Sequence, residues 1–297
     1  MKNLLSSESL SKEAIEEILQ KADSFLGYRG EDLKGKILAN LFYEPSTRTR
    51  LSFDTAMKRL GGEVLTVTDV HSTSIMKGET LDDTAKVISQ FADVVAIRHP
   101  ESGSAQRFAE NSDVPVINAG DGAGQHPTQG LLDLFTIQKE KGKVDGLKIV
   151  MTGDLKYSRC SNSLAYYLSN YDVEFVFVAP EQLKMKPELL KHLDEKGIKY
   201  SETDDFKKGI EGAEVLYCTR IQQERFASTA EYEELKDVYI LTKALVEKKC
   251  PDSIVMAPLP RVHEISKEVD ELPNAAYFRQ IENGVAVRMA ILTKMLS

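Results

Sequence analysis

The alternation of apolar, strand-like runs with helical runs is the sequence feature that most constrains this fold. Strand-like segments occupy residues 36–42, 63–68, 94–97 and 114–118, and helical patterns follow them at 46–60, 80–91, 103–111 and 130–139. A helix between successive strands is the usual crossover in a parallel sheet. We therefore expect a parallel sheet with helices on both faces in this half of the chain.

The same rhythm restarts after a charged, glycine-containing stretch at residues 139–143. Strand-like segments follow at 147–151, 174–178, 215–218 and 254–257, and a helix is expected from about residue 161. Residues 284–296 are apolar nearly all round, which is typical of a buried helix. We expect an α/β protein with two doubly wound parallel-sheet domains, at 1–140 and 141–283, and a last helix at about 284–297 that packs back on the first domain.

Charge and cysteine content exclude several classes of protein. With 38 basic and 46 acidic residues, the net charge of -8 argues against broad binding to nucleic acid or to an anionic membrane. No apolar run approaches the 18 residues of a membrane helix, and the first residues lack the apolar centre of a signal peptide. Three cysteines without a CxxC pair favour neither a disulfide framework nor a zinc site, so we expect a cytoplasmic protein.

Residues 44–50, with the sequence Glu-Pro-Ser-Thr-Arg-Thr-Arg, connect an expected strand to an expected helix. Amides at a helix start, hydroxyl groups and a guanidinium together suit a doubly charged phosphate. The alternative is a capped helix start with solvated arginines, which fits poorly with two arginines and three hydroxyls in five residues. The chain has no GxxxxGK[ST] loop, and Gly153 does not begin a GxGxxG motif, so a nucleotide site is poorly supported.

Two further motifs also follow expected strands. Arg98-His99-Pro100 comes after the strand at 94–97, and His126 lies in the Gln-His-Pro-Thr-Gln segment at 125–129. A single histidine is more often structural, but ligands of open parallel sheets bind beyond the carboxyl ends of the strands. There His126 could donate to a carbonyl oxygen that becomes an oxyanion, and Arg98 could add positive charge. We expect the active site in a cleft between the two domains.

Taken together, these motifs resemble those of the carbamoyltransferases. The first half carries Phe-x-Glu-x-Ser-Thr-Arg-Thr-Arg at 42–50, Arg-His-Pro at 98–100 and His-Pro-Thr-Gln at 126–129. The second half is similar to aspartate carbamoyltransferase catalytic chains at residues 153–159, 219–225 and 258–261. The resemblance covers essentially the whole chain. It implies a first domain that binds carbamoyl phosphate, a second that binds L-aspartate, and formation of N-carbamoyl-L-aspartate and phosphate in pyrimidine synthesis.

The resemblance also implies roles for individual residues. The phosphate would be held by Ser46, Thr47, Arg48 and Thr49, and Arg48 would neutralise charge on the leaving oxygen. The carbamoyl oxygen would be polarised by Thr49, Arg98 and His126, and its amino group oriented by Gln129 and the carbonyl of Leu259. The two carboxylates of aspartate would be held by Arg159, Arg220 and Gln222. We expect no metal or cofactor, because this chemistry rests on positioning and electrostatics, and the departing phosphate is a plausible proton acceptor, as the family also suggests.

Other residues are implied to act between subunits or on domain closure. Ser74 and Lys77 would enter the active site of a neighbouring subunit in a homotrimer, where Lys77 would contact both substrates. Glu44, Arg159 and Arg225 resemble a salt-bridged set that stabilises a closed state, although Arg225 could equally be a separate surface charge. Whether a regulatory chain also binds is left open.

Two positions depart from the family pattern. Ala257 replaces a histidine before Pro-Leu-Pro, and His263 replaces an aspartate, which could disturb the pairing of Arg261. The retained Pro-Leu-Pro predicts an unusual peptide bond and a correctly placed Leu259 carbonyl. An ornithine carbamoyltransferase is the nearest alternative, but its Asp-x-x-x-Ser-Met-Gly and His-Cys-Leu-Pro motifs are missing. A catalytically silent scaffold is the other, and it is disfavoured because Arg48, His126 and Lys77 are retained.

Overall fold

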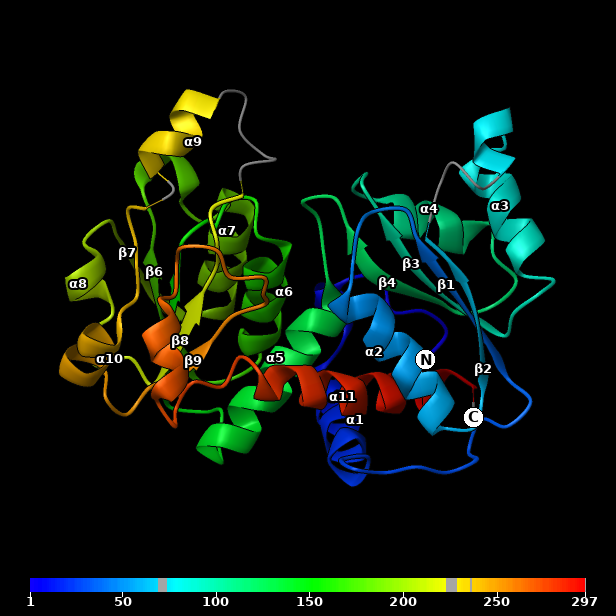
Figure 1. Ribbon diagram of the computed structural model, residues 1–297, viewed down its shortest axis with the longest axis horizontal. Coiled ribbons are helices and arrows are strands. Elements are labelled where there is room, and N and C mark those ends of the chain that lie inside the picture. The colour runs from blue at the N-terminus through cyan, green and yellow to red at the C-terminus, as the bar shows by residue number, and fades with distance from the viewer. Residues whose placement is uncertain (69–73, 223–228, 236, 297) are drawn as a thin grey trace. The chain divides into compact units, whose positions relative to one another are not determined.

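A computed structural model describes the chain except residues 69–73, 223–228, 236 and 297 (Figure 1). The chain divides into two compact units, Met1–Leu132 with Ile281–Ser297, and the remainder, Asp133–Gln280. The first division falls inside helix α5 (Pro127–Lys141), whereas we expected a joint at residues 139–143. That stretch is helical as far as Lys141 because lysine and glutamate are good helix formers.

The first unit contains a four-stranded parallel sheet in the order β2-β1-β3-β4. Its strands are β1 (Ile37–Phe42), β2 (Glu63–Val67), β3 (Val94–His99) and β4 (Val116–Asp121). Its helices are α1 (Lys12–Ser24), α2 (Arg48–Arg59), α3 (Leu81–Ile88), α4 (Ser104–Glu110), the start of α5 and α11 (Arg279–Leu296), with 3-10 turns η1 (Ser7–Ser9) and η3 (Ser74–Lys77). Helix α5 begins at Pro127 rather than at residue 130, since proline suits the first turn of a helix.

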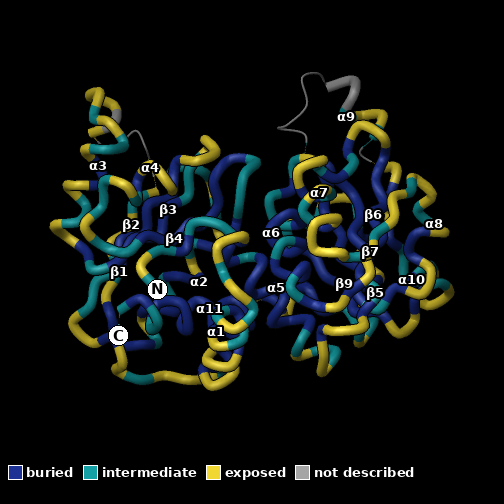
Figure 2. Tube along the Cα trace, turned by 180° about the vertical axis from the view of Figure 1, so that it is seen from behind, coloured by how far each residue is buried: buried dark blue, intermediate teal, exposed yellow. Residues whose placement is uncertain are grey.

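Both faces of this sheet are covered, as Figure 2 shows by the buried colour of its central strands. Ala39 and Leu41 of β1 pack into a core with residues of α3 and α4. Their neighbours Leu38 and Phe42, which point to the opposite face, are buried as well. Burial of both faces explains why the strands read as continuous apolar runs.

The second unit contains a five-stranded parallel sheet in the order β7-β6-β5-β8-β9. Its strands are β5 (Leu147–Thr152), β6 (Val173–Val178), β7 (Lys199–Thr203), β8 (Val215–Cys218) and β9 (Ile254–Met256). The remaining elements are α6 (Arg159–Leu168), α7 (Pro187–Lys196), α8 (Phe206–Gly209), α9 (Thr229–Leu235), α10 (Lys243–Lys249), η4 (Glu181–Leu183) and η6 (Lys267–Glu271). The two-sheet α/β fold is thus confirmed. Strand β7 was not expected, because its Lys-Tyr-Ser-Glu-Thr sequence is polar, as an edge strand allows.

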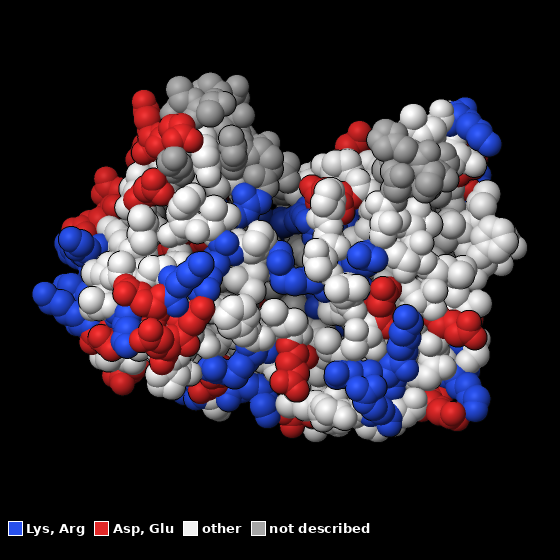
Figure 3. All heavy atoms as spheres, in the orientation of Figure 1, with Lys and Arg blue, Asp and Glu red and all other residues white. Residues whose placement is uncertain are grey.

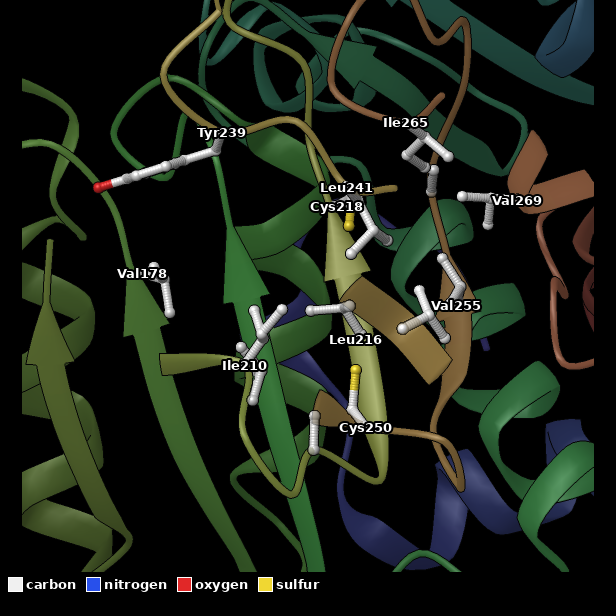
Figure 4. Packing of buried hydrophobic residues seen from close by; sticks show 14 of the residues in the cluster. Val178, Ile210, Leu216, Cys218, Tyr239, Leu241, Cys250, Val255, Ile265 and Val269 are labelled. Carbon is white, nitrogen blue, oxygen red and sulfur yellow. The ribbon is translucent and has the colours of Figure 1, made fainter. Parts of the chain in front are cut away.

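One core of the second unit forms between its central strands and the segments that follow β8. Leu216 and Val255 project from neighbouring strands toward Ile210 and Leu241 (Figure 4). Cys218 and Cys250 belong to the same cluster, and neither of them nor Cys160 forms a disulfide bond. Burial of apolar side chains holds this core together without a cross-link.

The order of strands reverses direction once in each sheet. From β1 the chain moves outward to β2 and then returns to β3, and from β5 it moves to β6 and β7 and then returns to β8. In doubly wound sheets, ligands bind beyond the carboxyl ends of the strands at such a reversal. Arg98 is the last residue but one of β3, and the segments with Arg48, Asp154 and Arg220 follow β1, β5 and β8.

The described part of the chain has no helix that is both long and apolar enough to cross a bilayer. On the face drawn in Figure 3, acidic and basic side chains lie interspersed over both units.

Candidate functional site

Residues 46–50 lie where the chain leaves β1 and enters α2. Thr47 occupies the N-cap position, and its hydroxyl makes no capping hydrogen bond. The N–H of Leu51 donates to the carbonyl of Thr47 at 3.0 Å, so the amides of Thr49 and Arg50 precede this intrahelical bond. A helix start of this kind, with Arg48 as its first residue, attracts an anion through its amides and its dipole.

Arg98 reaches this loop from the end of β3. Its Nε donates to Oε2 of Glu44 at 2.9 Å, and one terminal nitrogen lies 3.5 Å from Oγ of Ser46. The two charged side chains are only 15% and 23% exposed, which limits solvent screening of their attraction. The structure therefore brings Arg98, Ser46 and Glu44 together, and places the cation of Arg98 beside the start of residues 46–50.

His126 completes this group from the loop between β4 and α5. Its ring is 2% exposed, and Nε2 lies 3.4 Å from Oγ1 of Thr49. The backbone N–H of Gln129 donates to the carbonyl of His126 at 2.9 Å, which fixes Gln129 one turn into the same helix start. His126 and Thr49 thus present a ring nitrogen and a hydroxyl at one place, as a carbonyl-polarising pair requires.

The other histidine of these motifs has a structural role. His99 accepts a hydrogen bond at Nδ1 from the N–H of Glu101 at 3.1 Å and packs edge-on against Tyr43, with ring centroids 5.7 Å apart. Burial lowers the pKa of His99, against the opposing charges of Glu101 and Glu44.

Ser74 and Lys77 lie on η3, and both are exposed to solvent.

In the second unit, a buried carboxylate follows β5. Asp154 is fully buried; its Oδ1 accepts from the N–H of Tyr157 at 2.9 Å and its Oδ2 from Nε2 of Gln222 at 3.2 Å. Burial raises the pKa of Asp154, while hydrogen bonds from Tyr157 and Gln222 and the charge of Arg220 oppose this rise. Asp154 therefore orients Gln222 and lies in the field of Arg220.

The segment with Arg220 is tied to the end of β5 through Thr219. The N–H of Thr219 donates to the carbonyl of Thr152 at 2.8 Å, and its Oγ1 lies 3.0 Å from that oxygen and 3.3 Å from the carbonyl of Asp154. Arg159 is the first residue of α6, whose N-cap Ser158 accepts from the N–H of Ser161. Arg159 thus follows β5 and Arg220 follows β8, and these two neighbouring strands form the reversal point of this sheet.

The Pro-Leu-Pro segment after β9 has the unusual backbone that we predicted. The Leu259–Pro260 peptide bond is cis, and Leu259 has a φ of 53°. Just before it, Ala257 is buried in the core, and its N–H donates to Oε1 of Gln280 at 2.9 Å. The small side chain of Ala257 therefore packs in the core, and the hydrogen bond from its backbone N–H anchors the start of this segment.

His263 does not disturb the pairing of Arg261, contrary to the possibility raised by the sequence. Its guanidinium makes a two-bond ion pair with Asp270, at 2.5 and 2.6 Å, and a third bond to the hydroxyl of Tyr277 at 3.1 Å. His263 lies elsewhere, with Nδ1 3.8 Å from Oδ1 of Asp237. The partner of Arg261 is nine residues away in sequence, so the residue at 263 does not determine the pairing.

Sequence reasoning missed Asp154 as a site residue. The signal was a carboxylate directly after the expected strand and Gly153, a position that becomes buried when a parallel sheet is covered. Arg225 lies outside the described residues, so its expected pairing with Glu44 and Arg159 stays a prediction. Among the described residues, no group of three or more His, Cys, Asp or Glu side chains is arranged to hold a metal ion.

Comparison with known proteins matches two family models to consecutive parts of the chain. Residues 2–139 match the family model of the aspartate/ornithine carbamoyltransferase carbamoyl-phosphate-binding domain, and residues 145–295 match that of the aspartate/ornithine-binding domain. The aspartate carbamoyltransferase catalytic subunit of Methanocaldococcus jannaschii is 51% identical, over 100% of this chain and 98% of that protein.

Two solved structures are also similar to this chain. The catalytic subunit of M. jannaschii aspartate transcarbamoylase superposes with a TM-score of 0.92 and 50% identity, over 100% of this chain and 98% of the other. Trypanosoma cruzi aspartate transcarbamoylase, in complex with carbamoyl phosphate and aspartate, gives a TM-score of 0.94 and 38% identity, over 100% of this chain and 97% of the other. With both domain models matched and half of all residues identical over its full length, the chain belongs to the aspartate/ornithine carbamoyltransferase family.

Proposed function

We propose that this chain transfers the carbamoyl group of carbamoyl phosphate to the amino group of L-aspartate, giving N-carbamoyl-L-aspartate and phosphate. The observation that carries the proposal is identity of about half over the whole length with a catalytic subunit that is named for this reaction. The geometry supports it, because each unit gathers cationic side chains at the carboxyl ends of its own strands.

In the first unit, the residues suit the carbamoyl phosphate. We assign the phosphate to Ser46, Thr47, Arg48 and Thr49, and the carbamoyl oxygen to Thr49, Arg98 and His126. As the amine attacks the carbonyl carbon, negative charge grows on that oxygen, and preorganised donors stabilise it. We assign the carbamoyl amino group to Gln129, together with the carbonyl of Leu259 from the second unit.

In the second unit, the residues suit a dicarboxylate. Arg159 and Arg220 each provide a planar guanidinium that can grip one carboxylate, and Gln222 is oriented by Asp154. Ornithine carries an amine in place of the second carboxylate, so two arginines favour aspartate over ornithine. Transfer requires both sets of residues around one pair of substrates, and a shared cleft is therefore part of the proposal.

The chemistry needs no group beyond these side chains and the substrates. The aspartate nitrogen forms a bond to the carbamoyl carbon, the bond from that carbon to the phosphate oxygen breaks, and the departing phosphate takes the proton of the amine. Arg48 neutralises the charge on the leaving oxygen, so the protein acts by positioning and electrostatics.

We further propose a homotrimer in the cytoplasm, in which Ser74 and Lys77 of one subunit enter the site of the next. The exposure of both side chains on η3 leaves them accessible for such a role. Sedimentation of the purified protein tests the trimer, and sedimentation with a candidate regulatory chain tests a further partner. Mixing inactive Lys77→Ala subunits with inactive Arg48→Ala subunits should restore part of the activity if sites are shared.

The direct test is formation of carbamoyl-aspartate by the purified protein, with ornithine in a parallel reaction. Carbamoylation of ornithine but not of aspartate would overturn the assignment. Arg48→Ala should lower kcat by at least about 100-fold, the usual loss for a group that stabilises transition-state charge. Arg107→Ala, which removes a half-exposed arginine of the same unit, should leave kcat unchanged. Equal kcat in the two variants would reject the role of Arg48.

A further inference from the structure

Helix α11 carries a buried charge close to His126, which belongs to the candidate site of the first unit. Arg288 is 2% exposed, and its guanidinium carbon lies 5.0 Å from the ring centroid of Phe53 in α2. One terminal nitrogen donates to the carbonyl of Gly284 at 3.1 Å, and the other to Oγ1 of Thr128 at 3.4 Å. A buried arginine is costly unless its donors are used, so a specific role is expected.

Thr128 transmits this contact to His126. The threonine is fully buried, and in the described part of the chain its Oγ1 has two polar neighbours, the guanidinium of Arg288 and Nδ1 of His126 at 3.5 Å. Arginine has donors only, so the threonine oxygen must accept from it. The hydroxyl hydrogen of Thr128 then has Nδ1 of His126 as its acceptor.

We infer that Arg288, acting through Thr128, holds His126 in the tautomer that carries its proton on Nε2. The reversed arrangement would have Nδ1–H donate to the threonine oxygen, which would then accept two donors. The threonine hydrogen would lose its acceptor in a fully buried place, which is the costly outcome for a buried donor. The neutral ring therefore keeps Nδ1 bare and Nε2 protonated.

This assignment matters because Nε2 is the nitrogen that faces Thr49. It lies 3.4 Å from Oγ1 of Thr49, in the first turn of α2. A protonated Nε2 donates to an oxygen at that place, whereas a bare Nε2 would repel a developing oxyanion. The catalytic meaning of the tautomer rests on the proposed function, in which the carbamoyl oxygen binds here. Arg288 touches no substrate in this scheme and is a positioning residue.

The contacts of the relay are long, between 3.4 and 3.5 Å, as is common for catalytic hydrogen bonds before the substrate binds. Phe53 supports the guanidinium from α2 while Gly284 fixes it within α11, so the cation is held on two sides.

The test is ¹⁵N NMR of the intact protein, labelled at the ring nitrogens of its five histidines. At about pH 8.5 a histidine of ordinary pKa is neutral, so each ring shows one protonated and one bare nitrogen. His126→Gln identifies the His126 signals by their disappearance. We expect wild-type His126 to carry its proton on Nε2 and to show a hydrogen-bonded, bare Nδ1.

Variants of Thr128 and Arg288 then test the relay. Thr128→Val keeps the shape but removes the hydroxyl, so the Nδ1 signal should move toward that of a ring nitrogen without a donor. Thr128→Ser should restore the wild-type signal, and Thr136→Val, which removes an equally buried hydroxyl from the same helix, should leave it unchanged. Arg288→Met should shift the Nδ1 signal of His126, although residue 288 does not contact the histidine ring in this scheme. If Arg288→Met does not fold, Thr128→Val decides the test.

Two results overturn the inference: a wild-type His126 that carries its proton on Nδ1, or an Nδ1 signal that Thr128→Val does not move. Because the spectrum is recorded without substrates, it can support or reject the relay even if the protein fails to carbamoylate aspartate. If the protein is active, Thr128→Val should lower kcat about tenfold with unchanged KM values, the usual effect of one hydrogen bond, and Thr128→Ser should recover it.

Discussion

The addition of one methyl group at Gly153 should perturb both the fold and the candidate site of the second unit. It follows β5 with a φ of 105°, a conformation that side-chain-bearing residues rarely adopt. A Cβ placed there would lie 1.9 Å from the carbonyl oxygen of Thr219, where ordinary contact begins at 3.4 Å. Gly153→Ala therefore forces the end of β8 away by about 1.5 Å.

The cost follows from the contacts that this shift disturbs. A non-glycine residue in such a backbone conformation costs about 1–3 kcal/mol. The displaced Thr219 would also lengthen its bonds to the carbonyls of Thr152 and Asp154, at about 1 kcal/mol for each bond lost. We expect Gly153→Ala to lower the free energy of unfolding of the second unit by about 3–5 kcal/mol, a large part of the stability of a typical domain.

Urea unfolding measures this loss, and Gly197→Ala is the matched control. Gly197 also has a positive φ, 69°, but a Cβ there meets nothing within 4 Å, so only about 1 kcal/mol is expected. Because Thr219 adjoins Arg220, Gly153→Ala should also raise KM for aspartate without changing KM for carbamoyl phosphate. Equal losses of stability in the two variants, or an unchanged KM for aspartate, would refute the reasoning.

Three further outcomes are expected. Arg98→Met should lower kcat by about 100- to 1,000-fold in steady-state assays, because the donor that we propose for the carbamoyl oxygen is lost, and wild-type kcat would contradict this role. Burial raises the pKa of Tyr43 from 10.0 to about 12, so the folded state keeps the phenol proton at a higher pH than the unfolded state does. The free energy of unfolding should therefore fall by at most about 2.7 kcal/mol as the pH rises from 10 to 12, and alkaline unfolding of Tyr43→Phe should lack this fall. Gln280→Leu leaves Oδ1 of buried Asp133 and the N–H of Ala257 without this partner, so urea unfolding should show a loss of about 2–4 kcal/mol, whereas exposed Gln106→Leu should cost less than about 0.5 kcal/mol.

The sequence alone predicted the elements whose signals are local. The apolar runs of β1 and β5 identify buried strands, and Gly61 marks where the helix after β1 ends. The Ser-Thr-Arg-Thr-Arg turn and the loop with His126 could be placed near each other because both follow strands of one parallel sheet. Strand β7 escaped because an edge strand exposes polar residues and so has little apolar pattern.

Only the tertiary structure decided which side chains meet. Arg261 pairs with Asp270 rather than with a residue beside it, Asp154 is buried beside Gln222, and Arg288 reaches Thr128 from a helix at the other end of the chain. The sequence determined the kinds of element and the positions of their charged ends, since backbone preference and apolar periodicity act over a few residues. Which donor faces which acceptor depends on how the covered sheets and helices pack, and burial then sets the strength of each contact.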